Sequence, residues 1–121
     1  METNAGRGSV ISWDELPAPI AAYLPAHQAR DTETAISAFA ADAEVTDEGR
    51  THRGRDEIRF WLDNGASEYT YTTEFVGASR TGEGHVDVLQ HLEGDFPGGS
   101  ADLHYRFDLE GALIRRLVIE P

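Results

Sequence analysis

The stretch that decides the fold runs from Ile20 to Leu62 and reads IAAYLPAHQARDTETAISAFAADAEVTDEGRTHRGRDEIRFWL. Its first part predicts a helix from about Pro19 to Ala29, because one helical face at i, i+3, i+4 and i+7 carries Ile20, Tyr23, Leu24 and His27. Pro25 lies inside this helix and should kink it, since proline removes a backbone donor. This face therefore carries both a phenol and an imidazole.

A second helix, a strand and a loop are expected next. Asp31 is a suitable N-cap for a helix over Thr32–Phe39, whose inward residues would be Ile36 and Phe39. Ala43–Asp47 predicts a short strand, and residues 48–54 predict a polar loop. Asp47 then stands where the strand meets the loop.

The remaining sequence predicts one more helix followed by a meander of strands. Asp56 and Glu57 favour the start of the helix, which ends at Asn64-Gly65 and turns inward Ile58, Trp61 and Leu62. Four β-like runs separated by glycine-rich turns follow, at 68–79, 84–93, 100–109 and 112–120. Helices first and antiparallel strands afterwards indicate an α+β fold. We expect three N-terminal helices to cover one face of a strongly curved, mixed or antiparallel sheet and to enclose a pocket.

Composition limits the classes of protein that fit. The chain has 121 residues, which argues for one domain, with residues 1–11 as a disordered N-terminus and 12–121 as the folded part. It has no cysteine, and its first dozen residues lack the pattern of a signal peptide, so we expect a cytoplasmic protein. No stretch is apolar enough to span a membrane. A net charge of −12 disfavours nucleic acid as a partner.

This order of elements resembles the nuclear transport factor 2-like superfamily, in its SnoaL-like and ketosteroid-isomerase-like branch. The residues that carry the resemblance are Tyr23, Ala29-Arg30-Asp31, Phe39 to Val45, Asp47, Arg53-Gly54 and Arg106-Phe107-Asp108. It covers about residues 12–120 and implies a cone-shaped α+β domain around a deep apolar pocket, and commonly a homodimer. The resemblance says less about activity, because this fold hosts many functions.

The ketosteroid-isomerase resemblance assigns roles to particular residues. The catalytic base of that family falls at Asp47, and its oxyanion-hole tyrosine falls at Tyr23. Its second oxyanion donor, a protonated aspartic acid, falls at Leu103, which cannot donate a hydrogen bond. Loss of one such donor typically costs roughly 10²–10³ in rate. The resemblance therefore implies half of the isomerase machinery.

A second resemblance concerns Thr81 to Leu89, which looks like the strand of limonene-epoxide hydrolase that holds part of its Asp-Arg-Asp triad. Asp87 matches one aspartate of that triad. His85 stands where the arginine belongs, and Val118 stands near the position of the other aspartate. An epoxide-hydrolase activity that uses Asp87 is therefore a third hypothesis.

Each candidate has a plainer structural interpretation. Asp47 either faces an apolar pocket, which would raise its pKa and make it a usable base, or caps the turn at Glu48-Gly49. Tyr23 either donates into the pocket or is a core tyrosine, and His27 either lines the pocket mouth or favours the helix dipole. No set of histidines has a convincing spacing for metal ligands, so we expect no metal and no cofactor.

The strand over 84–93 has two possible orientations. Plain alternation turns the valines inward, whereas the epoxide-hydrolase resemblance turns Asp87 inward, and a one-residue slip exchanges the two faces. Arg115 and Arg116 straddle the last strand, and Arg116, if inward, would favour an anionic or polar oxygenated ligand. The other residues expected to shape the pocket are Trp61, Leu103, Tyr105 and Phe107.

The sequence therefore favours a small-molecule enzyme that transfers a proton on an apolar, carbonyl-bearing ligand, as an isomerase or a polyketide cyclase does. Asp47 would be the base and Tyr23 the donor to the developing oxyanion. The alternative is a non-catalytic ligand-binding or dimeric assembly module of the same fold, which the leucine at position 103 supports.

Overall fold

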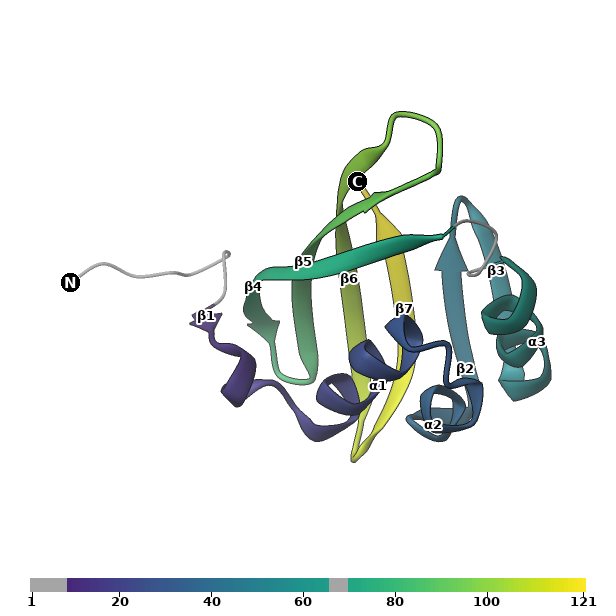
Figure 1. Ribbon diagram of the computed structural model, residues 1–121. Coiled ribbons are helices and arrows are strands. Elements are labelled where there is room, and N and C mark those ends of the chain that lie inside the picture. Colours follow the sequence, from purple (N-terminus) through teal and green to yellow (C-terminus); the bar gives the residue numbers. More distant parts are fainter. Residues whose placement is uncertain (1–8, 66–69) are drawn as a thin grey trace.

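The structure is a computed structural model that describes residues 9–65 and 70–121 (Figure 1). Three helices, α1 (Ala18–Gln28), α2 (Thr32–Ser37) and α3 (Gly54–Phe60), lie on one face of a curved, unclosed sheet. A 3-10 turn, η1 (Trp13–Glu15), precedes α1, and a π-helical turn, η2 (Trp61–Gly65), continues α3. The predicted α+β fold with three N-terminal helices is confirmed.

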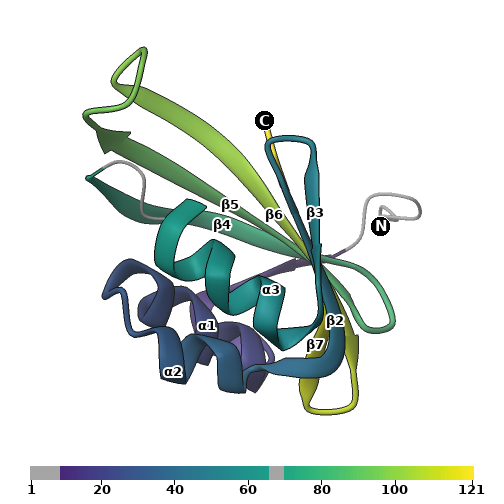
Figure 2. The same ribbon diagram turned by 90° about the vertical axis from the view of Figure 1, so that its right-hand side faces the viewer.

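The sheet is mixed and has seven strands. Neighbouring strands are antiparallel except for β2 and β7, which are parallel. Figure 2 shows how the strands bend around the helices. The order across the sheet is β1 (Ser9–Ile11), β4 (Tyr71–Gly82), β5 (His85–Gly94), β6 (Ser100–Glu110), β7 (Leu113–Glu120), β2 (Phe39–Asp47) and β3 (Arg50–Arg53).

Two short strands lie where the sequence predicts none. β3 occupies most of the predicted polar loop and pairs antiparallel with β2, where the hydroxyls of Thr46 and Thr51 lie 2.9 Å apart. β3 is an exposed edge strand, so it needs no apolar alternation that a sequence pattern could reveal. β1 falls within the predicted disordered terminus, because Ile11 is buried against the sheet and β1 pairs with β4.

Some boundaries also differ from the prediction. β2 begins at Phe39 rather than at residue 43, because a register shift lets its first residues pair with β7 before the regular ladder starts. The second helix is correspondingly shorter and ends at Ser37. Residues 1–8 of the predicted disordered segment, and residues 68 and 69 of the predicted first β run, lie outside the described residues.

The orientation of β5 is settled by burial. Val86, Val88, Gln90 and Leu92 are all buried on the inner face of the sheet, so simple alternation is correct. Asp87 therefore lies on the opposite, outer face of the sheet. A one-residue slip would have placed four polar side chains of this strand in the core.

The core lies between the helices and the part of the sheet that they cover. Tyr23 of α1 is fully buried and makes edge-to-face ring contacts with Phe39 and Phe107, at centroid distances of 5.4 and 5.9 Å. α1 continues through Pro25, whose side chain is exposed to solvent. In residues 9–65 and 70–121, no helix is long and apolar enough to cross a bilayer.

We predict that the covered face of the sheet carries the stability. Val88→Ala in β5 should lower the free energy of unfolding by about 1.5–3 kcal/mol, because it removes two methyl groups from a fully buried site. Urea denaturation measures this loss. Val76→Ala in β4 makes the same chemical change at a side chain that is 54% exposed, and should cost less than about 0.5 kcal/mol. Equal losses would contradict this account of the core.

Candidate functional site

A cavity of about 590 Å³ lies where the strands extend beyond the helices. Its volume is in the range of small-molecule sites. The sheet supplies most of the wall, together with the turn after β2 and the hairpin between β5 and β6. The apolar part of the lining includes Leu92, Phe96, Ala101, Leu103, Val118 and Ile119.

Asp47 is half-buried in the cavity wall at the end of β2. Burial raises the pKa of its carboxyl, and the nearby Glu48 raises that pKa further. The indole Nε1–H of Trp61 donates to Asp47 Oδ2 over 3.1 Å, which opposes the shift by favouring the charged form. The amide of Glu48 also donates to this carboxyl. The two interpretations of Asp47 thus coexist, since it contacts the turn and faces the cavity.

A chain of hydrogen bonds joins the core to the cavity beside Asp47. The Tyr23 hydroxyl lies 2.5 Å from Nδ1 of His27, one helical turn later on α1. His27 Nε2 lies 3.3 Å from the hydroxyl of Tyr71 at the start of β4. His27 and Tyr71 line the cavity, whereas Tyr23 is fully buried behind them. The expectation that Tyr23 donates directly to a ligand is therefore wrong, because its hydroxyl ends on His27.

Burial sets the protonation states of these groups. Desolvation lowers the pKa of His27 to about 4, so this imidazole is neutral at pH 7. Burial also raises the pKa of Tyr71 and of Tyr105. A hydrogen bond between the side chains of Gln90 and Tyr105 opposes this shift for Tyr105. These phenols therefore remain protonated and can act as hydrogen-bond donors.

Comparison with solved structures identifies the family. A candidate polyketide cyclase from Sinorhizobium meliloti is 30% identical, with a TM-score of 0.84, and the match covers 91% of this chain and all of that one. The chain belongs to the NTF2-like superfamily. Its neighbours place it in the SnoaL-like and ketosteroid-isomerase-like branch, as the sequence predicts. Neither the protein-family models nor the curated proteins gave a match.

Two more distant neighbours share the fold. A candidate ketosteroid isomerase from Kribbella flavida is 13% identical, with a TM-score of 0.73, and the match covers 87% of this chain and 76% of that one. A Mycobacterium tuberculosis protein in complex with estradiol-17beta-hemisuccinate is 14% identical, with a TM-score of 0.70 and coverage of 84% and 89%. At these identities the likeness concerns the fold alone.

The NTF2-like cavity contains part of the predicted site. His27, Leu103 and Tyr105 line it, as expected. Trp61 lies behind Asp47, and its ring is 5.4 Å from that of His27. Phe107 does not reach the cavity, because α1 covers that end of β6 and packs Tyr23 against it.

Arg116 is also misplaced by the sequence prediction. Its side chain is exposed, and it pairs in register with Asp108 on β6 and with Glu44 on β2, which lie on the outer face of the sheet. The buried residue that follows it, Leu117, takes the inward position instead. Arg116 therefore supplies no positive charge to the cavity.

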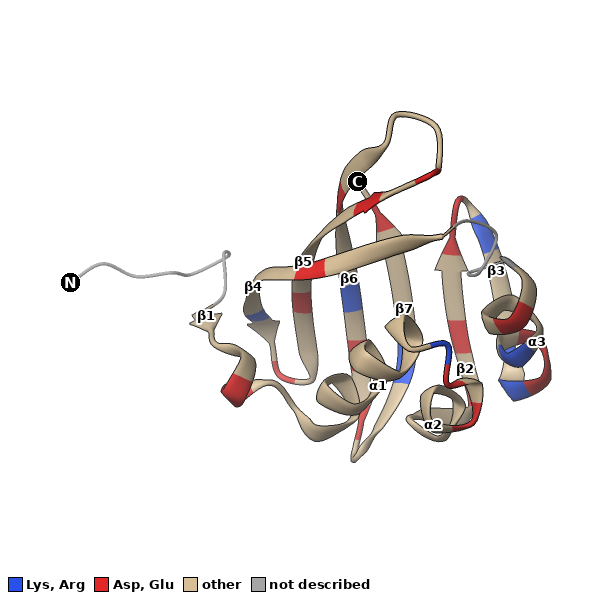
Figure 3. Ribbon diagram, in the orientation of Figure 1, with Lys and Arg blue, Asp and Glu red and all other residues tan. Residues whose placement is uncertain are grey.

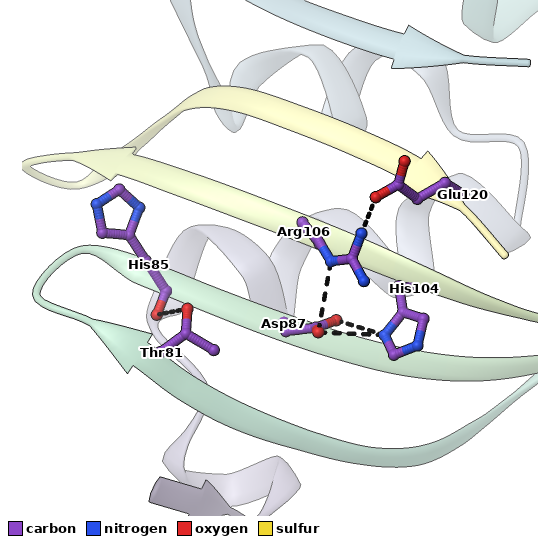
Figure 4. Close-up of polar contacts among 6 residues, drawn as sticks. All are labelled: Thr81, His85, Asp87, His104, Arg106 and Glu120. Carbon is purple, nitrogen blue, oxygen red and sulfur yellow. Dashed lines mark hydrogen bonds and ion pairs between the residues drawn. The ribbon is translucent and has the colours of Figure 1, made fainter. Parts of the chain in front are cut away.

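Asp87 belongs to a polar cluster on the outer face of the sheet (Figure 4). Its carboxylate pairs with His104 Nδ1 at 2.9 Å and with Arg106 Nε at 3.6 Å, and Arg106 also pairs with Glu120. A carboxylate–arginine–carboxylate set is thus present, but Asp87 and Arg106 do not line the cavity. Of this set, Glu120 alone also lines the cavity, so the structure gives no support to an epoxide hydrolase that acts through Asp87.

Sequence reasoning missed several lining residues. Tyr71 lies within the predicted β run 68–79, and Thr46 precedes Asp47 in the predicted strand, but neither carries a signal beyond its place in a β run. Phe96 lies in the β5–β6 hairpin, where an aromatic residue among glycines is a signal that this turn packs against something. Among the residues that the structure describes, no cluster of three or more candidate ligands could hold a metal ion.

We predict that two histidines titrate in opposite directions. His27 should have a pKa near 4, whereas the pKa of His91 should lie above its usual range because Asp102 and Glu93 hydrogen-bond to its ring. Ring-proton NMR titration measures both, and His27→Gln assigns the first. A His27 pKa at or above about 6.5 would contradict its desolvation in the cavity wall.

The lowered pKa of His27 also predicts how the free energy of unfolding changes with pH. The folded-state pKa of His27 lies below its unfolded value, so the folded state binds this proton less readily. Its contribution is fully present above pH ~6.5 and is lost as the pH falls toward 4. Urea unfolding between pH 7 and 4 should show a smaller loss for His27→Gln than for the wild type. An identical loss would remove His27 as a cause of acid destabilisation.

Proposed function

We propose that the protein is a cofactor-independent enzyme that transfers a proton on an apolar, carbonyl-bearing ligand, as an isomerase or a polyketide cyclase does. The observation that carries this proposal is Asp47, a carboxyl at the wall of an apolar cavity whose pKa is raised by burial. A carboxylate with a raised pKa is a stronger base than an exposed one, and proton abstraction next to a carbonyl needs such a base.

In this mechanism Asp47 removes a proton from the carbon beside the ligand carbonyl. Negative charge then develops on the carbonyl oxygen, which must be stabilised by donors held in place before the reaction. Tyr71 and Tyr105 line the same cavity and offer neutral hydroxyl donors, and the neutral ring of His27 contacts the Tyr71 hydroxyl through Nε2. Tyr23 acts through His27 and is a positioning residue, because its hydroxyl lies on Nδ1 of that ring.

The binding part of this proposal has independent support. The apolar lining suits a ligand with an extended hydrocarbon body, and the wall holds few polar groups that could orient its oxygen. The neighbour from Mycobacterium tuberculosis, of the same fold, was found with an estradiol ester. We infer that the present cavity also takes a small apolar oxygenated ligand.

The alternative is a non-catalytic binding module of the same fold. Leu103 lies in the cavity wall at the position where the family's second oxyanion donor was expected, and it favours this alternative because a leucine cannot donate. The catalytic proposal instead assigns the second donor to the hydroxyl of Tyr105, which lies two residues later on the same face of β6.

Asp47→Asn separates the two functions. Once a carbonyl substrate is found by screening, this variant should lose about 10²–10⁴ in kcat, because an amide cannot accept the proton. Its affinity for the ligand should change by less than about threefold, since the shape of the wall is kept. Steady-state kinetics and calorimetric binding measure the two quantities.

The matched control is Asp87→Asn, the same chemical change in the outer polar cluster. It should leave kcat within about twofold, because Asp87 lies on the other face of the sheet. An Asp47→Asn protein with full activity would end the catalytic proposal. Lost turnover with retained affinity would instead end the binding-only alternative.

We also infer that the protein is a homodimer, as is common for the family that it resembles. The outer face of the sheet carries no covering helix in the part of the chain that the structure describes, and this face is available for a second copy (Figure 2). Multi-angle light scattering at micromolar concentration should give twice the mass of the 13.3 kDa chain. A mass of one chain would refute the dimer.

A further inference from the structure

The ionisable side chains that line the cavity are acidic or uncharged. Three of them carry carboxyl groups, namely Asp47, Glu48 and Glu120. The imidazole of His27 is neutral at pH 7, because desolvation lowers its pKa to about 4. No arginine in residues 9–65 and 70–121 lines this cavity, and the sequence contains no lysine.

The nearest positive charges lie outside the cavity. Arg106 pairs with Glu120 from the outer face and offsets that carboxylate. Arg30 lines a separate, much smaller pocket that shares His27 and Tyr71 with the cavity, and its charge acts to lower the pKa of both side chains. Arg50 stands opposite Asp47 in the register of the β2–β3 hairpin, and its exposed side chain is not part of the lining. Glu48, which is exposed at the tip of this hairpin and lines the cavity, places a negative charge at the mouth.

The rest of the mouth suits an organic cation. Tyr71 and Phe96 make an edge-to-face ring contact there, with centroids 6.4 Å apart, and aromatic rings attract cations through their faces. Acidic residues also lie at the end of β7 and near the tip of the β2–β3 hairpin (Figure 3). The net charge of −12 draws cations toward the protein and repels anions.

We infer that the cavity selects a ligand whose apolar body carries a protonated amine, with the ammonium group beside Glu48 at the mouth, and that it rejects anionic ligands. The apolar body would lie on Leu103 and Ile119, deeper in the cavity. This inference rests on the proposed function only for the location of the site, and not for Asp47 as a base. It reverses the anionic preference that an inward Arg116 would have given.

Three probes that share one ring system test this charge preference. They are 2-naphthylmethylamine, 2-naphthylmethanol and 2-naphthoate, which are cationic, neutral and anionic at pH 7. Isothermal titration calorimetry at low salt should show the amine binding at least about tenfold more tightly than the alcohol, and the carboxylate most weakly. Raising the salt concentration should narrow the difference, since Glu48 is exposed and its charge is screened.

Glu48→Gln should bring the affinity for the amine within about threefold of that for the alcohol, and leave the alcohol unchanged. Glu83→Gln is the matched control, because it removes the same charge from the exposed β4–β5 turn, outside the cavity. It should preserve the preference for the amine. An equal loss in both variants would assign the preference to the overall charge and overturn the role of Glu48.

The inference also fails if the alcohol or the carboxylate binds as tightly as the amine, or if the amine does not bind at millimolar concentration. Asp47→Asn distinguishes this failure from failure of the proposed enzyme. That variant should keep a preference for the amine, because Glu48 remains, whatever happens to turnover. A preference for the amine without any turnover would thus support the ligand class and count against Asp47 as a base.

Discussion

The inner face of the sheet is longer than the helices that cover it. α1 has 11 residues and spans about 16 Å, whereas the 11 residues of β6 span about 36 Å. One end of the sheet is therefore packed against helices, as Phe107 is against Tyr23. The other end, with Leu103 and Ile119, keeps the same apolar face, and none of the described helices covers it (Figure 1). This difference in length leaves the cavity.

The position of Asp47 follows from the same constraint. β2 ends where the packed core gives way to the cavity, so the last side chain of the strand is partly desolvated but not sealed in. Trp61 can reach this carboxyl because η2 continues α3 across the end of β2. Burying a carboxylate without such a donor would cost more free energy, and a carboxylate that stayed exposed would have an ordinary pKa. The chemistry proposed for the site thus depends on where a strand ends relative to a helix.

The sequence patterns predicted which face of a strand a residue lies on better than they predicted where each helix or strand ends. The period of two correctly placed Leu103, Tyr105 and Phe107 on one face of β6, and it allowed two orientations of β5, of which burial selects the one with the valines inward. It could not say which of them meet a helix and which meet the cavity, because that depends on the lengths of other elements. For Asp87, local alternation was correct and the resemblance to another enzyme was misleading. β3, with four largely exposed polar residues, had no pattern to detect.

The charge of the cavity depends on how many basic side chains form ion pairs on the outer face of the sheet. Arg53 pairs with Glu44 there, Arg106 pairs with Asp87 and Glu120, and His85 pairs with Asp108. These cross-strand partners are fixed by register, and each one holds a cationic or potentially cationic group on the side away from the cavity. In a chain with 22 acidic and 10 basic residues, pairing on one face leaves few positive charges for the other. The acidic lining of the cavity is therefore a consequence of sheet register as much as of composition.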